Sequence, residues 1–438
     1  MIVKDIRREA IDFLKNYHMY YQDINMDEYV RIFINEMNQG LTGAKSSLQM
    51  IPTYIEVPDE LPIEDRVIAI DAGGTHCRVA LISFDRNRQP TVQFFEKLNM
   101  PGIKAEVSKE VFFQTLVRYV ENIVDQSEKI GFCFSFPTEI FPNKDGRLLG
   151  FSKEIRAPEV IGEVIGENLL LALKKSGHQE HKRIVLLNDT VATLLAGKIF
   201  SHNRSYDSYI GFVLGTGSNC CYIESNKNIF KKPDLNPGKS QIINIESGAY
   251  NKCPSGKIDN LFDQTTNTPG KYIYEKMFSG AYFGPFCLKT LQIAAKDGLL
   301  SPSTSQKILN LTSLETKDVS DFVTNLSDDN ILKKILHEEN DMDLITIYHL
   351  IDFLIERAAL LVAISLSAVC LQTGKGLNPF SPIFISAEGS TFYKLYQLKS
   401  RVEYYLDRYL VKEKGCYFEI HQIINATLIG AAIAGLTN

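Results

Sequence analysis

Two pairs of apolar runs, each joined by a short turn that contains glycine, form the clearest pattern in this chain. In the first pair, residues 67–70 are apolar, Asp71 ends the run, and a second apolar run begins at residue 77. In the second pair, residues 209–214 and 220–223 flank a Gly-Thr-Gly turn. Apolar runs of this length with glycine between them predict β-hairpins. Two such hairpins predict that the chain contains two related halves.

Strand and helix patterns alternate through the rest of the chain. Apolar residues at three- and four-residue spacing predict helices, and short β-branched runs predict strands. Gly40 is the expected end of the second helix. Predicted helices cover residues 6–17, 29–37, 111–124, 162–175 and 426–436, further strands cover 130–136, 183–187 and 382–386, and 270–372 is largely helical. This alternation predicts an α/β fold.

Acidic residues follow two of the predicted strands directly. Asp71 precedes the first glycine turn, and Asp189 stands between a buried strand and a helix of small residues. Side chains at the carboxyl ends of strands face ligands in α/β sheets. A carboxylate at such a position can hold a hydrated Mg²⁺, and glycine turns let a phosphate approach the backbone amides.

Composition and charge narrow the class of protein. The chain has 438 residues, 45% of them hydrophobic and 23% charged, with a net charge of −5 and no dense basic stripe. We therefore expect a globular protein that binds no nucleic acid. No apolar signal core begins the chain, and the apolar run at 358–370 is too short to span a bilayer, so we expect no membrane association and a cytoplasmic location. Eight scattered cysteines predict reduced core thiols.

Several blocks of this sequence resemble the hexokinase family of the actin-like sugar-kinase superfamily. The resemblance includes both hairpins and the segment around Asp189, and its blocks occur in family order from about residue 40 to the end. The further blocks are 47–54, 132–137, 151–153, 243–249, 275–284, 387–390 and 428–432. The ordered set is far more specific than any single motif.

The resemblance implies an α/β fold of two lobes, the actin-like (ribonuclease H-like) sugar kinase fold, with a cleft between a small and a large lobe. We expect residues 66–189 and 424–438 to form the small lobe. Residues 1–65 and 190–423 would form the large lobe, which contains the second hairpin. The family's substrate would bind in the cleft between them.

The resemblance also implies the catalytic and sugar-binding residues. Asp189 would be the general base that accepts the proton of the sugar hydroxyl, and Lys153 would offset charge on the moving phosphoryl group. An alternative is that Asp189 only caps the following helix. Buried polar groups would replace the water around each sugar hydroxyl. By resemblance, the sugar-binding residues are Ser135, Ser152, Lys153, Asn188, Asp189, Asn219, Glu246 and Glu275.

ATP and Mg²⁺ are the cofactors that the resemblance implies. Asp71 would reach Mg²⁺ through water, and Arg78 would be either structural or close to the phosphates. Gly389 and Ser390 resemble the adenine and ribose end of the site, although a Gly-Ser pair can also be a simple turn. The expected nucleotide-binding residues are Asp71, Gly73, Gly74, Thr75, Arg78, Gly215, Thr216, Gly389 and Ser390.

The implied activity is transfer of the γ-phosphoryl group of ATP to the 6-hydroxyl of glucose or a related hexose. The expected partner is a hexose, and glucose is the first candidate. The protein is expected to be a monomer or a homodimer. Ser247 stands where the family commonly has Trp, and Tyr272 where it has Gln, which leaves the preferred hexose open. A hexose sensor without catalysis is the alternative. A sensor would be free to lose Asp189, Thr75 and Thr216, but this chain keeps all three. An actin-like or chaperone-type ATPase fits less well, because Ser135 and Glu246 belong to sugar-binding blocks.

Overall fold

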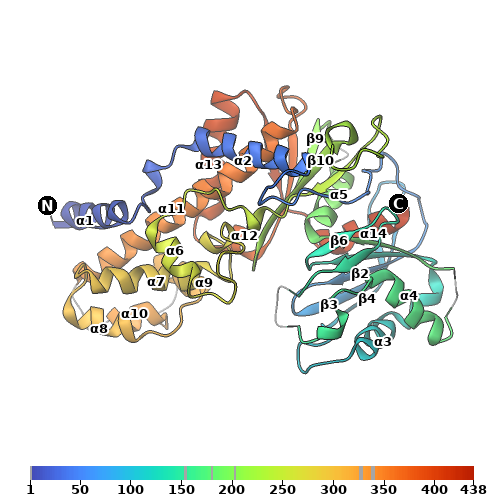
Figure 1. The fold of residues 1–438 in the computed structure, drawn as a ribbon, viewed down its shortest axis with the longest axis horizontal. Helices are drawn as coiled ribbons and strands as arrows, with labels where there is room; N and C mark the ends of the chain where they lie inside the picture. Colours follow the sequence, from blue (N-terminus) through green and yellow to red (C-terminus); the bar gives the residue numbers. More distant parts are fainter. Residues whose placement is uncertain (1, 152–154, 179–180, 202–203, 325–328, 337–340) are drawn as a thin grey trace.

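Two β-sheets, one in each of two lobes, lie beside each other along the long axis of the protein, and helices extend from the large-lobe sheet toward the end that carries helix α1, Ile2–Asn16 (Figure 1). The computed structural model describes residues 2–151, 155–178, 181–201, 204–324, 329–336 and 341–438. The small-lobe sheet has the order β4-β3-β2-β5-β8. Its strands are β2 (Val67–Ala72), β3 (His76–Phe84), β4 (Pro90–Asn99), β5 (Lys129–Phe134) and β8 (Arg183–Leu187).

The large-lobe sheet repeats this arrangement. Its order is β1-β11-β10-β9-β12-β13, so that its five longer strands have the same chain order as those of the small lobe. In both sheets an antiparallel hairpin lies beside two parallel strands. The strands are β1 (Ile51–Pro52), β9 (Ser208–Leu214), β10 (Ser218–Ser225), β11 (Ser240–Asn244), β12 (Ile383–Glu388) and β13 (Phe418–His421). The predicted α/β fold with two related halves is confirmed.

Two helices cross between the lobes. Helix α5 (Asp189–Phe200) follows the last small-lobe strand, β8, but packs against β9 and β12 of the large lobe. Helix α14 (Ala426–Thr437) follows the last large-lobe strand, β13, but packs against β2 and β5 of the small lobe. The two helices also pack against each other. The chain therefore passes between the lobes at two helices that are in contact.

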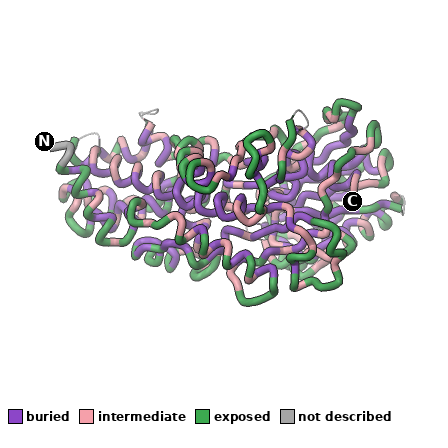
Figure 2. Tube along the Cα trace, turned by 90° about the horizontal axis from the view of Figure 1, so that it is seen from above, coloured by how far each residue is buried: buried purple, intermediate pink, exposed green. Residues whose placement is uncertain are grey.

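Helices cover the sheets. Helices α3 (Lys109–Val120) and α4 (Ile165–Lys175) pack on the small lobe, whose core they share with β2, β3 and β5. The large lobe carries α1 (Ile2–Asn16), α2 (Met26–Thr42), α6 (Lys257–Asp263), α7 (Phe283–Lys296), α8 (Pro302–Asn310), α9 (Thr316–Thr324), α10 (Ile331–Leu336), α11 (Asp341–Gln372), α12 (Ser390–Lys394) and α13 (Leu398–Leu406). Figure 2 shows buried residues along the whole length of the protein.

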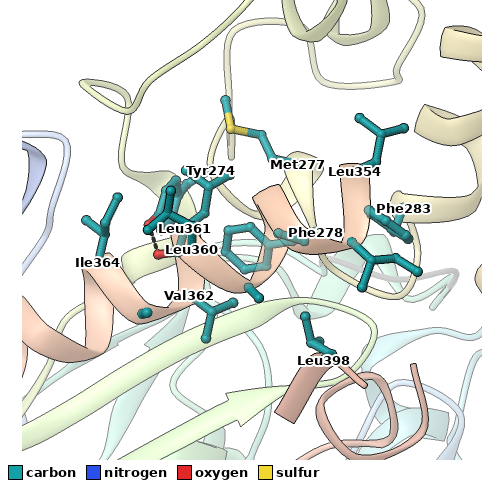
Figure 3. Packing of buried hydrophobic residues seen from close by; sticks show 14 of the residues in the cluster. Tyr274, Met277, Phe278, Phe283, Leu354, Leu360, Leu361, Val362, Ile364 and Leu398 are labelled. Atoms are coloured by element: carbon teal, nitrogen blue, oxygen red, sulfur yellow. Dashed lines mark hydrogen bonds between the residues drawn. The ribbon is translucent and has the colours of Figure 1, made fainter. Parts of the chain in front are cut away.

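Helix α11 is the central helix of the large-lobe core. It is longer than the apolar run in the sequence, and by length and composition it could cross a membrane. However, 89% of its most apolar window is buried inside the protein, which is typical of a core helix. Figure 3 shows Leu354, Leu361 and neighbouring residues of α11 packed against Tyr274 and Phe278. This packing holds the segment around Tyr274, which directly precedes the predicted site residue Glu275.

The predicted elements are present, with differences at their ends and at the sheet edges. Helix α2 continues past Gly40 and ends at Gly43, whose φ of 79° is the left-handed conformation of a helix cap. The sequence did not predict the edge strands β4 and β13, or the small hairpin of β6 (Thr138–Ile140) and β7 (Gly146–Leu148). These strands are largely exposed or very short, so the burial that makes an inner strand recognisable is weak in them.

Candidate active site

Three parallel strands of the small lobe bring predicted site residues to one edge. Asp71 on β2 is paired with Cys133 on β5, and Cys133 is paired with Leu187 on β8. Ser135 follows Cys133 by two residues, and Asn188 and Asp189 directly follow Leu187. Burial raises the pKa of the Cys133 thiol, and the neighbouring Asp71 and Asp189 carboxylates raise it further. Asp71, Ser135, Asn188 and Asp189 are thus gathered at the carboxyl edge of this sheet.

Asn188, rather than Asp189, is the N-cap of α5. Its Oδ1 accepts from the Thr190 amide at 3.0 Å and from the Thr190 hydroxyl at 2.7 Å. Oδ1 of the Asp189 carboxylate also accepts from the Thr190 amide, at 2.8 Å. Since the cap is provided by Asn188, helix capping does not explain why an acid stands at position 189. The Nδ2 group of Asn188 remains available to a ligand in the cleft.

Asp71 is buried and paired with Arg78 of the same hairpin. Its Oδ2 accepts from Arg78 Nε at 2.8 Å and from the Arg78 Nη2 group. The hydroxyl of Thr427, at the start of α14, donates to the same oxygen at 3.0 Å. Arg78 also donates to Thr427 and to Asn425 Oδ1. Arg78 therefore connects the first hairpin to the helix that returns from the large lobe.

Asn219, Asn244 and Glu246 form a hydrogen-bonded cluster on the large lobe. Asn219 Oδ1 accepts from the amides of Cys220 at 2.7 Å and Ser247 at 3.1 Å, which directs its Nδ2 toward Asn244. Asn219 Nδ2 donates to Asn244 Oδ1 at 2.7 Å, and Asn244 Nδ2 donates to Glu246 Oε1 at 2.8 Å. Asn219 Nδ2 also lies 3.5 Å from Asn188 Oδ1. The cluster is thus in contact with the small-lobe edge that carries Asp189.

Glu246 has an unusual backbone and an unfavourable charge environment. Its φ of 59° lies in the left-handed region, which a residue with a side chain seldom adopts. Burial raises the pKa of the Glu246 carboxyl and so does Asp189, while the hydrogen bond from Asn244 opposes both. Two carboxylates close enough to affect each other's ionisation, together with a strained backbone, are typical of a functional site.

Glu275 is held beside the second hairpin by the core. Its Oε2 accepts from the Ser218 amide at 3.0 Å, and any side chain at Gly217 or Gly248 would meet this carboxylate at 2.8 Å. Glu275 begins the short helix η6 (Glu275–Met277). The neighbouring Tyr274 is buried and donates to the Leu361 carbonyl of α11, as Figure 3 shows. The packing against α11 therefore fixes the backbone that carries Glu275.

The two positions that depart from the family pattern have different environments. Tyr272 is half-buried with a φ of 53°, and burial, then Glu246 and Glu275, raise the pKa of its hydroxyl. Its ring thus lies near both carboxylates. Ser247 is only 2% exposed, and its hydroxyl lowers the pKa of the buried Cys220 thiol. Ser247 therefore faces the core, whereas Tyr272 lies near the two carboxylates that the sequence predicts as sugar ligands.

The second hairpin and Gly389 are packed backbone to backbone. A Cβ at Gly389 would lie 2.1 Å from the Leu214 carbonyl oxygen, and its φ of 113° also requires glycine. The Gly215 carbonyl accepts from the Gly280 amide at 2.8 Å and from the Thr391 hydroxyl at 2.9 Å. Gly215, Thr216, Gly389 and Ser390 are thus brought together, as the sequence predicts.

A large cavity lies beside this group. Its volume is about 960 Å³, and its walls include Thr216 and Ser390 together with residues of α7, α9 and α12. Gly280 and Ala281 of the wall belong to the family block 275–284, whereas most of the other lining residues are separated along the chain and belong to no motif recognised in the sequence. Those with polar side chains include Thr316, Lys317, Lys289, Lys394 and Glu315. Lysines and hydroxyls around an apolar floor suit a phosphorylated aromatic ligand.

Glu388 is a further site residue that the sequence analysis missed. It ends β12, directly before Gly389, much as Asp71 stands near the end of β2, one residue before the first glycine turn. Burial raises the pKa of the Glu388 carboxyl, while Arg78 lowers it and Asp71 raises it. Glu388 of the large lobe therefore lies near the charged pair of the small-lobe hairpin. An acid at a strand end before glycine was the signal that could have identified it.

The turn amides and two loop residues complete the predicted set. The amides of Gly73 and Gly215 donate within their own turns, each at 3.0 Å, so that the anion-binding amides would be those of Gly74, Thr75, Thr216 and Gly217. Thr75 and Thr216 are exposed at the turns. Ser152 and Lys153 lie outside the described residues.

No cluster of three metal-ligating side chains occurs among residues that the structure describes. Asp71 and water suit Mg²⁺, which commonly keeps several waters and few protein ligands.

Comparison with known proteins identifies the family. Two models of the hexokinase family match the chain, one over residues 13–199 and the other over residues 209–437. Human Hexokinase-2 is 27% identical over 402 residues, which are 86% of this chain and 43% of that protein. Human Hexokinase-1 is 29% identical over 413 residues, which are 88% of this chain and 44% of that protein. The chain thus spans less than half the length of these relatives.

Solved structures show the same fold. The hexokinase of Schistosoma mansoni, complexed with glucose, has a TM-score of 0.80 and 23% sequence identity, with both chains covered completely. Another hexokinase crystal structure has a TM-score of 0.78 and 21% identity, with 98% of this chain and 99% of that chain covered. The two sheets, the crossing helices and the cleft residues define an actin-like sugar kinase fold. With both family models matched, the chain belongs to the hexokinase family.

Proposed function

We propose that this protein is an ATP-dependent hexokinase that transfers the γ-phosphoryl group of ATP to the 6-hydroxyl of glucose or a related hexose. Asp189 carries the proposal, because its carboxylate stands at the edge of the small-lobe sheet and influences the ionisation of Glu246 on the large lobe. A base between two lobes, beside polar groups from both, suits proton transfer from a hydroxyl bound in the cleft.

The polar groups around Asp189 suit a sugar. The oxygen of Asn188 accepts from the Thr190 amide, so its Nδ2 can donate to a ligand, and the Nδ2 of Asn219, which already donates to Asn244, has a second N–H. Glu246 and Glu275 offer carboxylates, each of which can accept from two neighbouring hydroxyls. Ser135 adds a hydroxyl that can donate or accept. Ser152 and Lys153, from the family resemblance, are proposed to complete the sugar site and, for Lys153, to stabilise the moving phosphoryl group.

The nucleotide is proposed to bind between the two hairpins and the cavity beside Thr216. The turn amides of both hairpins would hold phosphates, and the cavity of about 960 Å³ would hold the adenosine. Asp71 would hold Mg²⁺ through water, with Arg78 fixing its carboxylate. The bound Mg²⁺ would neutralise charge on the β- and γ-phosphates during transfer. Glu388, which faces Arg78 and Asp71 from the large lobe, would help to position this group.

A hexose sensor on the same scaffold is the second candidate. It would bind sugar and change conformation without phosphoryl transfer. The retained base at Asp189 and the retained threonines at the two hairpin turns favour the enzyme, because a sensor needs none of the three. The two candidates differ in a single measurable property, which is turnover in the presence of bound sugar.

A panel of hexoses with ATP and Mg²⁺ tests the proposal. We expect release of ADP that depends on glucose or a related hexose, with the 6-phosphate identified as the product by NMR or mass spectrometry. Sugar binding without ADP release would support the sensor. Release of ADP that is the same without sugar would support an ATPase and contradict both proposals.

A further inference from the structure

Asn244, the last residue of β11, lies at the centre of the hydrogen bonds among the proposed sugar ligands. Its Oδ1 accepts from Asn219 at 2.7 Å, and its Nδ2 donates to Glu246 at 2.8 Å. The Thr190 hydroxyl lies 3.4 Å from the same Oδ1. Asn244 itself is only 5% exposed. It is therefore buried more deeply than Asn219 and Glu246, the two half-buried ligands that it joins.

We propose that Asn244 is a positioning residue, which bridges Asn219 and Glu246 and so fixes the orientation of both side chains toward the sugar. The inference rests on the proposed function, because it concerns the sugar site of a hexose kinase. Asn244 would contact no reacting atom. Its effect would be transmitted through the two side chains that it holds.

An amide is required at this position by the donors and acceptors on its two sides. Asn219 turns its Nδ2 toward residue 244, because its own oxygen accepts from two backbone amides. Glu246 turns a carboxylate oxygen toward residue 244. Residue 244 must therefore accept on one side and donate on the other, which an ionised Asp or an apolar side chain cannot do.

The bridge also favours the ionised form of Glu246. Burial and the neighbouring Asp189 raise the pKa of this carboxyl, and the hydrogen bond from Asn244 lowers it. The other titratable groups near Glu246 are Tyr272 and, beyond its ring, Glu275. Ionised Glu246 accepts only, so it can receive hydrogen bonds from sugar hydroxyls. Loss of the donor at residue 244 would therefore weaken the sugar site through Glu246.

The first test uses no sugar. Urea unfolding is measured from pH 6 to pH 8.5 for Asn244→Asp, Glu246→Gln and the double variant. In Asn244→Asp, the pair of acids shares a proton at low pH and loses it as pH rises, so the urea midpoint should fall with rising pH relative to the wild type. In the double variant, the new carboxylate at position 244 can accept from the new amide at position 246 and from Asn219, so the midpoint should recover. The two changes should thus be strongly non-additive.

The second test measures sugar affinity by calorimetry, since the chain contains no tryptophan to report binding by fluorescence. Asn244→Asp should weaken glucose binding on the order of tenfold at pH 8, and the affinity should improve toward pH 6 as the shared proton restores the donor. The double variant should stay weak, because the neutral amide at position 246 also presents donors. Asn330→Asp is the matched control: Asn330 is buried in the large lobe, outside the hydrogen-bonded cluster of the sugar ligands, and donates to the Asp318 carbonyl.

Additive unfolding effects, or a loss of sugar affinity that is equal at every pH, would overturn the bridge, because a general packing defect has no such signature. A wild-type protein that binds no hexose would instead overturn the proposed function. The unfolding measurements contain no sugar, so these two failures are distinguished.

Discussion

Gly430 on α14 and Ala192 on α5 touch backbone to backbone: a Cβ at Gly430 would lie 1.9 Å from the Ala192 carbonyl oxygen. No side chain separates the two crossing helices at this point. Gly131 on β5 allows a similar approach, because its Cβ would lie 1.7 Å from the Ala431 carbonyl oxygen. The contact between the lobes thus depends on residues that lack a side chain, and any motion of one lobe against the other must occur around it.

Gly430→Ala should destabilise the protein by roughly 1–3 kcal/mol or more, because the added methyl group must displace backbone. The measurement is urea or thermal unfolding. Gly150→Ala is the matched control, since a Cβ there meets nothing within 4 Å. An equal, small effect of the two substitutions would show that the helices can separate without cost and would contradict the close contact.

Asp189→Asn should lower turnover by a factor on the order of 10² or more while leaving sugar affinity largely unchanged. The amide has nearly the size of the carboxylate but cannot accept the proton of the hydroxyl. Steady-state kinetics and calorimetry measure the two effects separately. Asp234→Asn, in an exposed loop, controls for loss of one negative charge. Near-normal turnover of Asp189→Asn would exclude Asp189 as the base.

Sugar should bring the lobes together. The proposed sugar ligands are divided between the lobes, with Asn188 and Asp189 on one and Asn219 and Glu246 on the other, so that simultaneous contact would favour closure and exclude water. The radius of gyration from solution scattering should fall at saturating glucose, and Asp189→Asn should show the same change. A scattering profile that sugar leaves unaltered would contradict a closing cleft.

Tyr272 should influence which hexose is preferred, since its ring lies near Glu246 and Glu275. Tyr272→Gln should change the ratios of kcat/KM among glucose, mannose, fructose and 2-amino sugars, while glucose remains a substrate. Tyr272→Phe separates the hydroxyl from the ring. Ser247→Trp should mainly lower stability, because Ser247 faces the core. Unchanged ratios in both Tyr272 variants would exclude this residue from specificity.

The raised pKa of Glu246 gives sugar binding and stability opposite pH dependences. Binding needs the ionised acceptor, so affinity should fall as pH falls through a pKa above that of an ordinary glutamate. Stability should change in the other sense: the folded state holds this proton more tightly than the unfolded state, so the contribution of Glu246 rises as pH falls through the same range. Glu246→Gln should remove both dependences. Calorimetry and urea unfolding, each measured against pH, report the two dependences. A wild-type sugar affinity that stays constant until the pH reaches the pKa of an ordinary glutamate would contradict the prediction.

Local sequence patterns determined much of the fold. Periodic apolar positions identified α1, α2, α4 and the inner strands β2, β3, β5, β9, β10 and β12, because burial selects apolar side chains at the period of each element. The glycine turns marked both hairpins, and strand-end acids marked Asp71 and Asp189. The order of the family blocks then assigned the remaining candidate residues. The edge strands β4, which is largely exposed, and β13, which is short and only half-buried, were missed, since an edge strand needs fewer apolar residues.

Only the tertiary structure decided how these parts meet. The family resemblance already divided the chain between the lobes at α5 and α14, but the close backbone contacts at Gly430 and Gly131 are encoded by no local pattern. The capping role of Asn188, the inward direction of Ser247 and the bridge at Asn244 depend on which donors and acceptors come within hydrogen-bond distance from distant segments. Local composition sets the type of each element, whereas hydrogen-bond partners and pKa shifts arise from atoms that are far apart in the chain.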